Sequence, residues 1–425
     1  MLLEQLIHYF TSNGVVIFLE SQNSEHCWAR KSYLAASPKA ILKARGKDIY
    51  LNQGGHEEHT VGDPWDALQA FQEERKDWLF GYLGYDLKNA LERLTSGNKD
   101  LVQAPDLYFM VPEFLLEIDN KTRDYRVLKG KIPILSDVEG NSITSSENFD
   151  LGDLAFQTNK AAYLEKIRKA QHSIHEGEFY EINLSHQLKG KFRGSSWGLY
   201  KRMREIGSVP FGAYIKDEDI TICSQSPERF LRKEGTTILS QPIKGTAPRS
   251  EDHEEDMSFK NRLSLSPKER AENLMIVDLV RNDLSKIASK GSVTVPQLFS
   301  IESFGTVHQM VSTIKAEAKE GNPVAIIKAC FPMGSMTGAP KISAMKAIEE
   351  LEDYRRGIYS GAIGYITPHA DFDFNVVIRT AIINHHNIFY STGGAITSES
   401  VAIEEWEETL IKVRALIETN LHPQR

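Results

Sequence analysis

Residues 358–383 have the sequence IYSGAIGYITPHADFDFNVVIRTAII. Two runs rich in β-branched and aromatic residues, 358–366 and 374–383, flank a turn-forming segment, so this stretch predicts two neighbouring strands. The same pattern occurs earlier, at 107–118 and 124–128. Strands that come in neighbouring pairs, with helices grouped between them, favour an α+β fold with antiparallel sheets over strict alternation of strand and helix.

Helices are expected where apolar residues recur at helical spacing behind a capping residue. The segments with this pattern are 64–75 behind Asp63, 158–174 with Thr158 as the cap, 267–288 behind Ser266, the segment that opens at Pro340, and 402–420. Ser, Asn, Asp and Gly dominate 134–157, which predicts a loop or linker. We therefore divide the chain into an N-terminal region (1–133), this loop (134–157) and a second region (158–420).

The composition is that of an ordinary globular protein. The 425 residues are 41% hydrophobic and 25% charged, which supports a large core. A net charge of −8 argues against binding to nucleic acid or to an acidic membrane. No apolar run approaches the roughly 20 residues of a transmembrane helix, and residues 1–10 lack the pattern of a signal peptide. Three cysteines, Cys27, Cys223 and Cys330, are too few for a disulfide framework, which indicates a reducing, cytoplasmic location.

Two of the expected helices carry pairs of glutamates. Glu269 and Glu272 are three residues apart, as are Glu405 and Glu408, so each pair lies on one helix face. If the two faces meet, four carboxylates converge, and such a cluster is tolerable with a cation among them. Oxygen ligands suggest Mg²⁺. From spacing alone, solvated helix faces are the commoner explanation of such pairs.

Lys244 is held between a proline and a glycine in QPIKGTAPR (241–249). A buried lysine with a lowered pKa can act as a nucleophile or a base. Glu228, which follows a proline, is a candidate partner for proton transfer. Taken in isolation, each residue is more often the side chain of a surface turn.

Three further segments are candidates for binding an anion. The glycines of GSMTGAPK (334–341) can turn backbone N–H groups outward at the start of a helix, although the spacing is not that of a nucleotide-binding loop. Arg379 lies in an apolar run and either clamps a carboxylate or forms a structural ion pair. Gly393 and Gly394 belong to a small-residue turn that suits close approach of a ligand.

Taken in order, these segments resemble the chorismate-utilising enzymes, a family that includes anthranilate, isochorismate and salicylate synthases and the enzymes that form aminodeoxychorismate. The resemblance covers residues 158–418 and a shorter N-terminal block, and eleven motifs in the same order make it highly specific. The motifs are GYLGYD (81–86), GEFYEINLS (177–185), SPERFL (226–231), PIKGTAPR (242–249), KERAENLMIVDLVRNDL (268–284), TVHQMVSTI (306–314), FPMGSMTGAPKISAMKAIEELE (331–352), GAIGYI (361–366), NVVIRTA (375–381), TGGAITSES (392–400) and EEWEETLIKVRAL (404–416).

The resemblance implies a fold in which antiparallel β-sheets form a central sandwich, with helices outside and the active site between the two halves. It also implies a reaction. Family members that aminate the 4-position of chorismate usually have PIKGT, whereas anthranilate synthases usually have PIAGT, so Lys244 favours formation of 4-amino-4-deoxychorismate, a precursor of 4-aminobenzoate and folate. Lys244 would attack C2 as the 4-hydroxyl leaves, and ammonia would then displace the lysine. A lysine in this role must be neutral, so we expect its pKa to be depressed.

The resemblance also assigns expected roles to site residues. Glu228 is the acid/base, with His308 as a further candidate, although relatives have a histidine where this chain has Gln309. The Mg²⁺ ligands are Glu269, Glu272, Glu405 and Glu408. The expected substrate-binding residues are Gly245, Thr246, Thr337, Tyr365, Arg379, Gly393, Gly394 and Lys412. Glu181 stands where amino-transferring relatives commonly have glutamine, and no role is assigned to it.

The chain has no Cys-His-Glu glutaminase signature, so the resemblance implies that a separate glutaminase subunit supplies ammonia. Two alternatives stay open. In the first, the chain is an anthranilate synthase component and Lys244 is a neutral substitution. In the second, it is a non-catalytic subunit that binds an effector, because residues 18–21 (FLES) resemble a segment that shapes a tryptophan pocket in relatives.

Overall fold

The structure is a computed structural model that describes residues 2–22, 30–134, 147–207, 209–218, 220–305 and 307–421. Cys27 and residues 135–146 of the predicted loop lie outside this described part. The helices are α1 (Leu2–Asn13), α2 (Pro64–Arg75), η1 (Tyr85–Ala90), α3 (Lys160–His175), α4 (Ser196–Ile206), α5 (His253–Leu265), α6 (Pro267–Ser285), α7 (Pro323–Cys330), η3 (Gly334–Met336), α8 (Lys341–Leu351) and α9 (Ala402–Leu421). None of the helices in the described residues is long and apolar enough to cross a bilayer.

The strands outnumber the helices and come from both predicted regions. They are β1 (Val16–Glu20), β2 (Lys31–Arg45), β3 (Asp48–Gln53), β4 (His56–Val61), β5 (Leu79–Leu83), β6 (Leu107–Asp119), β7 (Tyr125–Lys129), β8 (Phe149–Leu151), β9 (Ala155–Phe156), β10 (Glu181–Gly194), β11 (Phe211–Asp217), β12 (Ile220–Ser226), β13 (Arg229–Glu234), β14 (Thr237–Gln241), β15 (Ile243–Pro248), β16 (Thr294–Ser303), β17 (Val307–Glu317), β18 (Gly338–Ala339), β19 (Ala362–Ile366), β20 (Phe372–Val376), β21 (Thr380–Asn384) and β22 (Asn387–Ile396).

One continuous series of antiparallel pairings links most of these strands. It runs in the order β10, β22, β21, β12, β11, β1, β2, β6, β5, β19, β20, β13, β14, β17 and β16. The pairings β1–β11 and β5–β19 build strands of residues 1–133 into sheets with strands of residues 158–420. The predicted α+β class with antiparallel sheets is therefore confirmed, while the region boundaries stay predictions.

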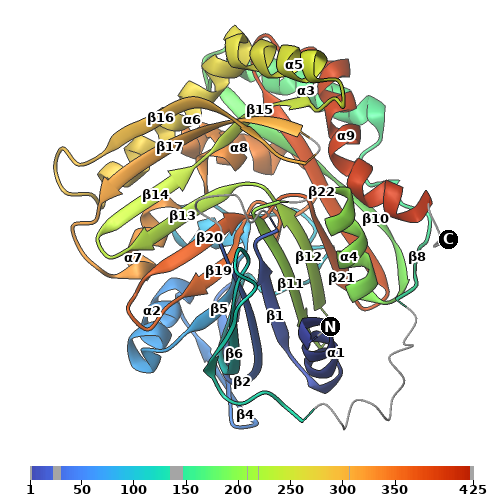
Figure 1. The fold of residues 1–425 in the computed structure, drawn as a ribbon. Helices are drawn as coiled ribbons and strands as arrows, with labels where there is room; N and C mark the ends of the chain where they lie inside the picture. Colours follow the sequence, from blue (N-terminus) through green and yellow to red (C-terminus); the bar gives the residue numbers. More distant parts are fainter. Residues whose placement is uncertain are drawn as a thin grey trace.

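The long strand β6 shows how these sheets form a sandwich. Its inward residues, Tyr108, Met110 and Leu115, pack into a core with β1, β5 and β11. Its outward residues change partners along the strand: Phe109 lies in the core beneath α2, α6 and α7, whereas Leu116 lies in the core beneath α1, α4 and α9. Because successive side chains of a strand point to opposite faces, the inner core is covered on both sides by sheet and the outer faces are covered by helices. Figure 1 shows α2 and α7 on one side of the molecule and α1, α4 and α9 on the other.

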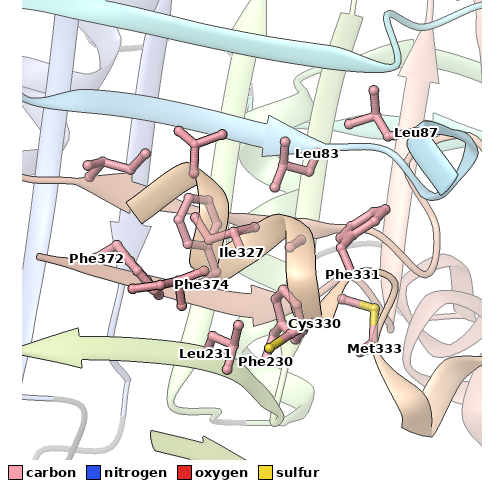
Figure 2. Close-up of a cluster of buried hydrophobic side chains, with 14 of the residues drawn as sticks. Leu83, Leu87, Phe230, Leu231, Ile327, Cys330, Phe331, Met333, Phe372 and Phe374 are labelled. Carbon is pink, nitrogen blue, oxygen red and sulfur yellow. The ribbon is translucent and has the colours of Figure 1, made fainter. Parts of the chain in front are cut away.

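The outer core under α7 lies behind the segment that carries Glu228. Figure 2 shows Phe230 and Leu231, which follow Glu228 in the chain, packed with Cys330, Phe331, Met333 and Phe374. All of these side chains are buried. A tightly packed core resists small displacements, so this cluster fixes the backbone on which Glu228 is held.

The sequence did not predict the 15-residue strand β2, because Pro38 interrupts its pattern and a proline removes one donor from the sheet. The structure accommodates Pro38 at a β-bulge, where the register with β6 shifts between Pro38 and Ala40. Ser37 has a φ of 53° at this point. The irregularity thus lies at the place where the partner of β2 changes from β1 to β3.

Other expectations differ from the structure in detail. The single strand predicted at 374–383 is two strands, β20 and β21, because the chain turns at Arg379, whose φ is 50°. The cap of α3 is Asn159 instead of Thr158: the Asn159 side chain accepts a hydrogen bond from the backbone N–H of Ala162, whereas the Thr158 hydroxyl donates to Asp353. Residues 149–156 of the predicted loop include β8 and β9, which pair with β10.

Candidate active site

The segments that carry most of the predicted site residues meet where β10 lies between β22 and β18. Strand β10 pairs with β22 along ten residues and with β18 through Glu181 and Ile182. Helices α6 and α9 approach this place, and Lys268 of α6 forms an ion pair with Glu405 of α9 at 3.5 Å. Residues from distant parts of the chain therefore share one location, as the sequence predicted.

Lys244 and Glu181 form a buried ion pair at the centre of this location. The Lys244 Nζ lies 2.6 Å from Glu181 Oε1, and their side chains are 10% and 1% exposed. The second carboxylate oxygen of Glu181 is buried and has no hydrogen-bond partner among the described residues. The alternative that Lys244 is an ordinary surface-turn lysine is thereby excluded.

The electrostatic surroundings of Lys244 differ from the expectation of a depressed pKa. Burial acts to lower the pKa, but the carboxylates of Glu181, Glu272 and Glu228 outweigh it, so the pKa of Lys244 is raised above its ordinary value. The expectation was wrong because the sequence showed the lysine without its neighbours. Before substrate binds, the lysine is therefore an ammonium ion.

Glu228 is held between β12 and β13 and is 4% exposed. Its Oε1 accepts a hydrogen bond of 2.6 Å from the Ser335 hydroxyl of η3. Burial raises the pKa of Glu228 to about 7, against the opposing effects of Ser335 and Lys244. A carboxyl group that titrates near neutral pH can both donate and accept a proton, which suits the expected acid/base role.

The four glutamates of α6 and α9 face one another across a lysine. Lys268 Nζ lies 3.9 Å from Glu272 Oε1 and 3.5 Å from Glu405 Oε1. Burial raises the pKa of Glu269 and of Glu405, and raises that of Glu272 to about 7. Negative charge at this location is therefore only partly compensated by the chain itself.

Glu408 differs from the other three glutamates. It pairs with Lys412 at 2.5 Å, and Lys412 holds its pKa below the ordinary value. The Lys412 Nζ also donates to the carbonyl oxygen of Gly393 at 2.8 Å. Lys412 therefore ties the carboxylates of α9 to strand β22.

The described residues contain no group of three or more His, Cys, Asp or Glu side chains already arranged as a ligand set for a metal. The donor set nevertheless fits a hard divalent cation. Its oxygens come from facing helices, the Oε1 atom of Glu272 is buried with no hydrogen bond, and the Lys268 ammonium stands near Glu272 and Glu405 as a cation would. A bound cation would offset the burial, and the smaller repulsion from Glu181 and Glu269, that raise the pKa of Glu272.

The fold requires glycine at three positions of the site, each for a different reason. Gly245 has a φ of 78° at a β-bulge, and a Cβ there would lie 2.7 Å from Glu269 Oε2, so its absence lets α6 approach β15. A Cβ on Gly394 would lie 3.3 Å from Glu405 Oε2. Gly393 instead packs against β10, because its Cβ would lie 2.3 Å from the Leu184 carbonyl oxygen. The expected turn at 392–395 is thus strand β22, and Gly394 is the glycine that faces the carboxylates.

Among the described residues, no carboxylate lies within ion-pair distance of the Arg379 guanidinium. The side chain is partly buried, and burial lowers its pKa. The structural ion pair that was the alternative interpretation is therefore not observed in the described part. A half-buried guanidinium without an anion is suited to a carboxylate of a ligand.

Tyr365, the expected partner of Arg379, lies elsewhere. Its ring packs against Tyr33, Trp78 and Phe80, at the end of β19 opposite to the end that approaches the Arg379 turn. Tyr365 therefore belongs to the inner core between the sheets.

His308 and Gln309 point to opposite faces of β17. The His308 ring contacts Ser303 Oγ at 2.8 Å and Asp256 at 3.0 Å, so neither ring nitrogen contacts another predicted site residue. The amide of Gln309 lies 3.5 Å from the Thr246 hydroxyl. The structure therefore places Gln309, and not His308, beside an expected substrate-binding residue.

Thr337 is fully buried, and its hydroxyl donates to the carbonyl oxygens of Met333 and Gly334, at 3.2 Å each. Its own carbonyl oxygen accepts from the backbone N–H of Asn183. Thr337 thus stabilises η3, the element that presents Ser335 to Glu228. The sequence missed Ser335 and Lys268 as members of the site, because Ser335 contacts Glu228 and Lys268 joins α6 to Glu405, both distant in the chain.

Comparisons with known proteins agree with this arrangement. A family model described as chorismate binding enzyme matches residues 15–418. Aminodeoxychorismate synthase component 1 of Klebsiella aerogenes is 34% identical over 96% of this chain and 95% of its own. Anthranilate synthase component 1 of Aquifex aeolicus is 31% identical over 94% of this chain and 88% of its own. The crystal structure of anthranilate synthase component I from Streptococcus pneumoniae TIGR4 superposes with a TM-score of 0.80 at 27% identity, covering 92% of each chain.

Proposed function

The chain belongs to the chorismate binding enzyme family, and from this premise we propose that it converts chorismate and ammonia to 4-amino-4-deoxychorismate. The observation that carries the proposal is the position of Lys244. This lysine of the PIKGT motif is buried against Glu181 and lies near Glu228 and Glu272. Such a position suits a nucleophile and does not suit a residue that has been neutrally replaced.

In the proposed reaction, the Lys244 amine forms a bond to C2 of chorismate, the ring double bond shifts, and the bond between C4 and the hydroxyl breaks. Glu228 supplies the proton with which the hydroxyl leaves as water. Its pKa of about 7 keeps a sufficient fraction protonated at neutral pH, and the Ser335 hydrogen bond holds the carboxyl in place. Ammonia then adds at C4 and the bond to Lys244 breaks, which restores the free lysine.

Binding of chorismate is proposed to use charges that the chain itself leaves unpaired. Arg379 would hold the enolpyruvyl carboxylate, because no carboxylate of the described chain pairs with it. Thr246, Gln309 and the backbone near Gly394 would border the ring. These groups orient C2 towards Lys244 and C4 towards Glu228.

Glu269, Glu272, Glu405 and Glu408 are proposed to hold Mg²⁺, directly or through water. Bound there, Mg²⁺ would neutralise the repulsion between these glutamates and the ring carboxylate of chorismate. The support is the partly uncompensated charge of the cluster. One buried oxygen of Glu272 accepts no hydrogen bond from the described residues, and the pKa of Glu272 is raised.

The ammonia is proposed to come from a separate glutaminase subunit, and the product to serve 4-aminobenzoate and folate synthesis in the cytoplasm. The support is that the Klebsiella relative is named as a component 1, and that this sequence has no glutaminase signature of its own. Free ammonium is expected to replace the partner in vitro.

The test is a product assay. The purified chain is incubated with chorismate, Mg²⁺ and ammonium, and the products are resolved by mass spectrometry with and without an aminodeoxychorismate lyase. We expect 4-amino-4-deoxychorismate, which becomes 4-aminobenzoate when the lyase is present. Anthranilate would instead assign the chain to the activity named for the Aquifex relative. No turnover with ammonium or with an added glutaminase subunit would favour the non-catalytic alternative.

A further inference from the structure

Glu181 is a charged residue for which the proposed reaction gives no role. It opens strand β10 and is 1% exposed, so water does not share its charge. Its Oε1 accepts a hydrogen bond of 2.6 Å from Lys244 Nζ. Its Oε2 is buried without a partner among the described residues. One interaction, with Lys244, therefore accounts for the contacts observed at this carboxylate.

The reaction requires that Lys244 lose a proton in this same place. An ammonium nitrogen has no lone pair, so it cannot form the bond to C2 until a base has taken a proton from it. Because the Lys244 side chain is only 10% exposed, a base within hydrogen-bond reach takes its proton faster than solvent does.

We propose that Glu181 is the group that accepts the proton of Lys244 and so releases the amine for attack on chorismate; this proposal rests on the proposed function, in which Lys244 is the nucleophile. Glu181 acts through Lys244 and is in this sense a positioning residue: it holds the nitrogen in place and takes its proton.

The surroundings of Glu181 make the transfer feasible. The Lys244 Nζ and Glu181 Oε1 are already joined by a hydrogen bond of 2.6 Å, so the proton needs no rearrangement of either side chain to cross. Transfer also converts a buried ion pair into a buried neutral pair, which lowers the desolvation penalty of both groups. Bound substrate would remove the remaining solvent exposure of Lys244 and would favour the neutral pair further.

The other carboxylates that face Lys244 are less suited to the task. Glu228, from the turn between β12 and β13, is hydrogen-bonded to Ser335 and must hold a proton for the leaving hydroxyl. Glu272 and Glu269, from α6, belong to the proposed Mg²⁺ cluster. In the described structure, Glu181 is the carboxylate whose hydrogen bond with the Lys244 nitrogen is formed.

The protons balance over the complete cycle. In the first half, the proton moves from Lys244 Nζ to Glu181 Oε1, the lone pair of the amine forms the C2–N bond, and the resulting secondary ammonium keeps the two remaining hydrogens. In the second half, ammonia forms the C4–N bond, the C2–N bond breaks to release the neutral lysine amine, and the ammonium at C4 gives a proton back to Glu228. Glu181 then returns its proton to the lysine nitrogen. No oxidant, reductant or further co-reactant is needed.

The experiment measures formation of the Lys244 adduct in a single turnover with chorismate and Mg²⁺ in the absence of ammonium. The reaction is quenched at set times, and the modified peptide is quantified by mass spectrometry. The enzymes compared are the wild type, Glu181→Gln, Glu181→Asp and Glu178→Gln. Gln is isosteric with Glu, so the fold is expected to survive, and Glu178 is an exposed glutamate three residues away that serves as the matched control.

For Glu181→Gln near pH 7.5, we expect adduct formation at least about tenfold slower than in the wild type. The rate of this variant should also rise about tenfold per pH unit between about pH 7 and pH 9, since solvent must then take the proton. Glu181→Asp should keep a partial rate with the pH profile of the wild type. Glu178→Gln should match the wild type in both respects.

Three outcomes would overturn the proposal, and they are distinguishable. If the wild type forms the adduct and Glu181→Gln matches its rate and pH profile, Glu181 is not the acceptor while the proposed function stands. If the wild type forms aminodeoxychorismate when ammonium is supplied but no adduct in its absence, the nucleophilic role of Lys244 fails, and that of Glu181 with it. A purely structural loss in Glu181→Gln would lower the rate without changing its pH dependence, and would also count against the proposal.

Discussion

The molecule contains two buried charged clusters only a few residues apart on β10, and they are built in opposite ways. In the first, Arg356 uses all five of its N–H donors: two on Glu352, two on the carbonyl oxygens of Met336 and Asn183, and one on the Ser360 hydroxyl. In the second, the Lys244 cluster, one carboxylate oxygen of Glu181 and one of Glu272 are buried without a hydrogen bond from the described residues.

The difference indicates which cluster serves the fold and which is reserved for a ligand. A fully paired buried charge stabilises the arrangement of the segments it joins, here β10, η3 and the loop before β19. An incompletely paired cluster is costly for folding, and it is retained where binding or chemistry requires it. Both clusters look alike in the sequence, because each combines a basic residue with glutamate.

The largest expected effect tests the Lys244 cluster directly. Lys244→Met should lower kcat/KM for aminodeoxychorismate formation by at least about 10³-fold, because no other group can form the adduct. The exposed Lys346→Met is the control and should leave turnover unchanged. Steady-state kinetics with ammonium measures both. If Lys244→Met turns over at the wild-type rate, the reaction does not proceed through a covalent adduct with this lysine.

Glu228 should give the next largest effect. Glu228→Gln is expected to lower kcat by about 10²–10⁴-fold, because glutamine cannot protonate the leaving hydroxyl. In the wild type, the alkaline limb of the pH profile should follow the pKa of about 7 of Glu228. The kcat should therefore fall as the pH rises above about 7, because the carboxyl group loses its proton. Residual activity of the variant that still showed this limb would assign it to another group.

The Arg356 cluster should respond in stability. Arg356→Met leaves Glu352 buried and unpaired, which should lower the free energy of unfolding by about 3–5 kcal/mol. Arg168→Met removes an exposed ion pair with Glu165 and should change it by less than about 0.5 kcal/mol. Urea unfolding followed by fluorescence measures both changes. Equal effects of the two substitutions would contradict the structural role of the cluster.

Removing the charge of Glu272 should stabilise the protein, whereas removing that of Arg356 should destabilise it. Its folded pKa of about 7 exceeds the value of 4.5 expected in the unfolded chain, so the folded state binds more protons and loses stability as the pH rises from about 4.5 through 7. Without metal at about pH 8, Glu272→Gln should therefore be more stable than the wild type by about 1–3 kcal/mol, and the gain should vanish near pH 5.

Added Mg²⁺ supplies the companion measurement for Glu272. It should raise the melting temperature of the wild type and should have a much smaller effect on Glu272→Gln, because the variant has lost an anionic ligand. An equal Mg²⁺ response of the two proteins would remove Glu272 from the proposed cation site.

Two adjacent glycines give the smallest and sharpest contrast. Gly393→Ala places a Cβ 2.3 Å from the Leu184 carbonyl oxygen and should destabilise the protein by about 2–4 kcal/mol. Gly394→Ala meets the Glu405 carboxylate at 3.3 Å, so stability should change by less than about 1 kcal/mol. The apparent Mg²⁺ affinity of Gly394→Ala should fall about 3–10-fold. Thermal unfolding and Mg²⁺ titration of turnover separate the two glycines.

Much of the fold was predictable because its signals are local. The cap of α6 at Ser266 and that of α2 at Asp63 are both observed, since a capping side chain bonds to the backbone two or three residues away. The strand β2 was missed, because the bulge that accommodates Pro38 depends on the neighbouring strand β6. The break at Arg379 was missed for a similar reason, since apolar patterning does not encode a positive φ.

The candidate site was predicted less evenly. Each glutamate pair was found from its spacing, but Lys268, which joins the two helices, was not. Tyr365 was expected beside Arg379, but its ring packs against Tyr33, Trp78 and Phe80, because a local pattern does not say which layer of the fold a side chain enters. The direction of the Lys244 pKa was also predicted incorrectly, because it depends on three carboxylates from other segments.

The sequence by itself determined the family, the antiparallel α+β class and the chemical types of the reacting groups. Motifs, the patterns of paired strands and helix caps depend on residues that are close together in the chain. The tertiary structure decided which of those groups meet, which charges are paired and which are left open. Hydrogen bonds form only at contact and Coulomb interactions weaken with distance, so the charge of Lys244 is set mainly by residues 181, 228 and 272, which become its neighbours only when the chain folds.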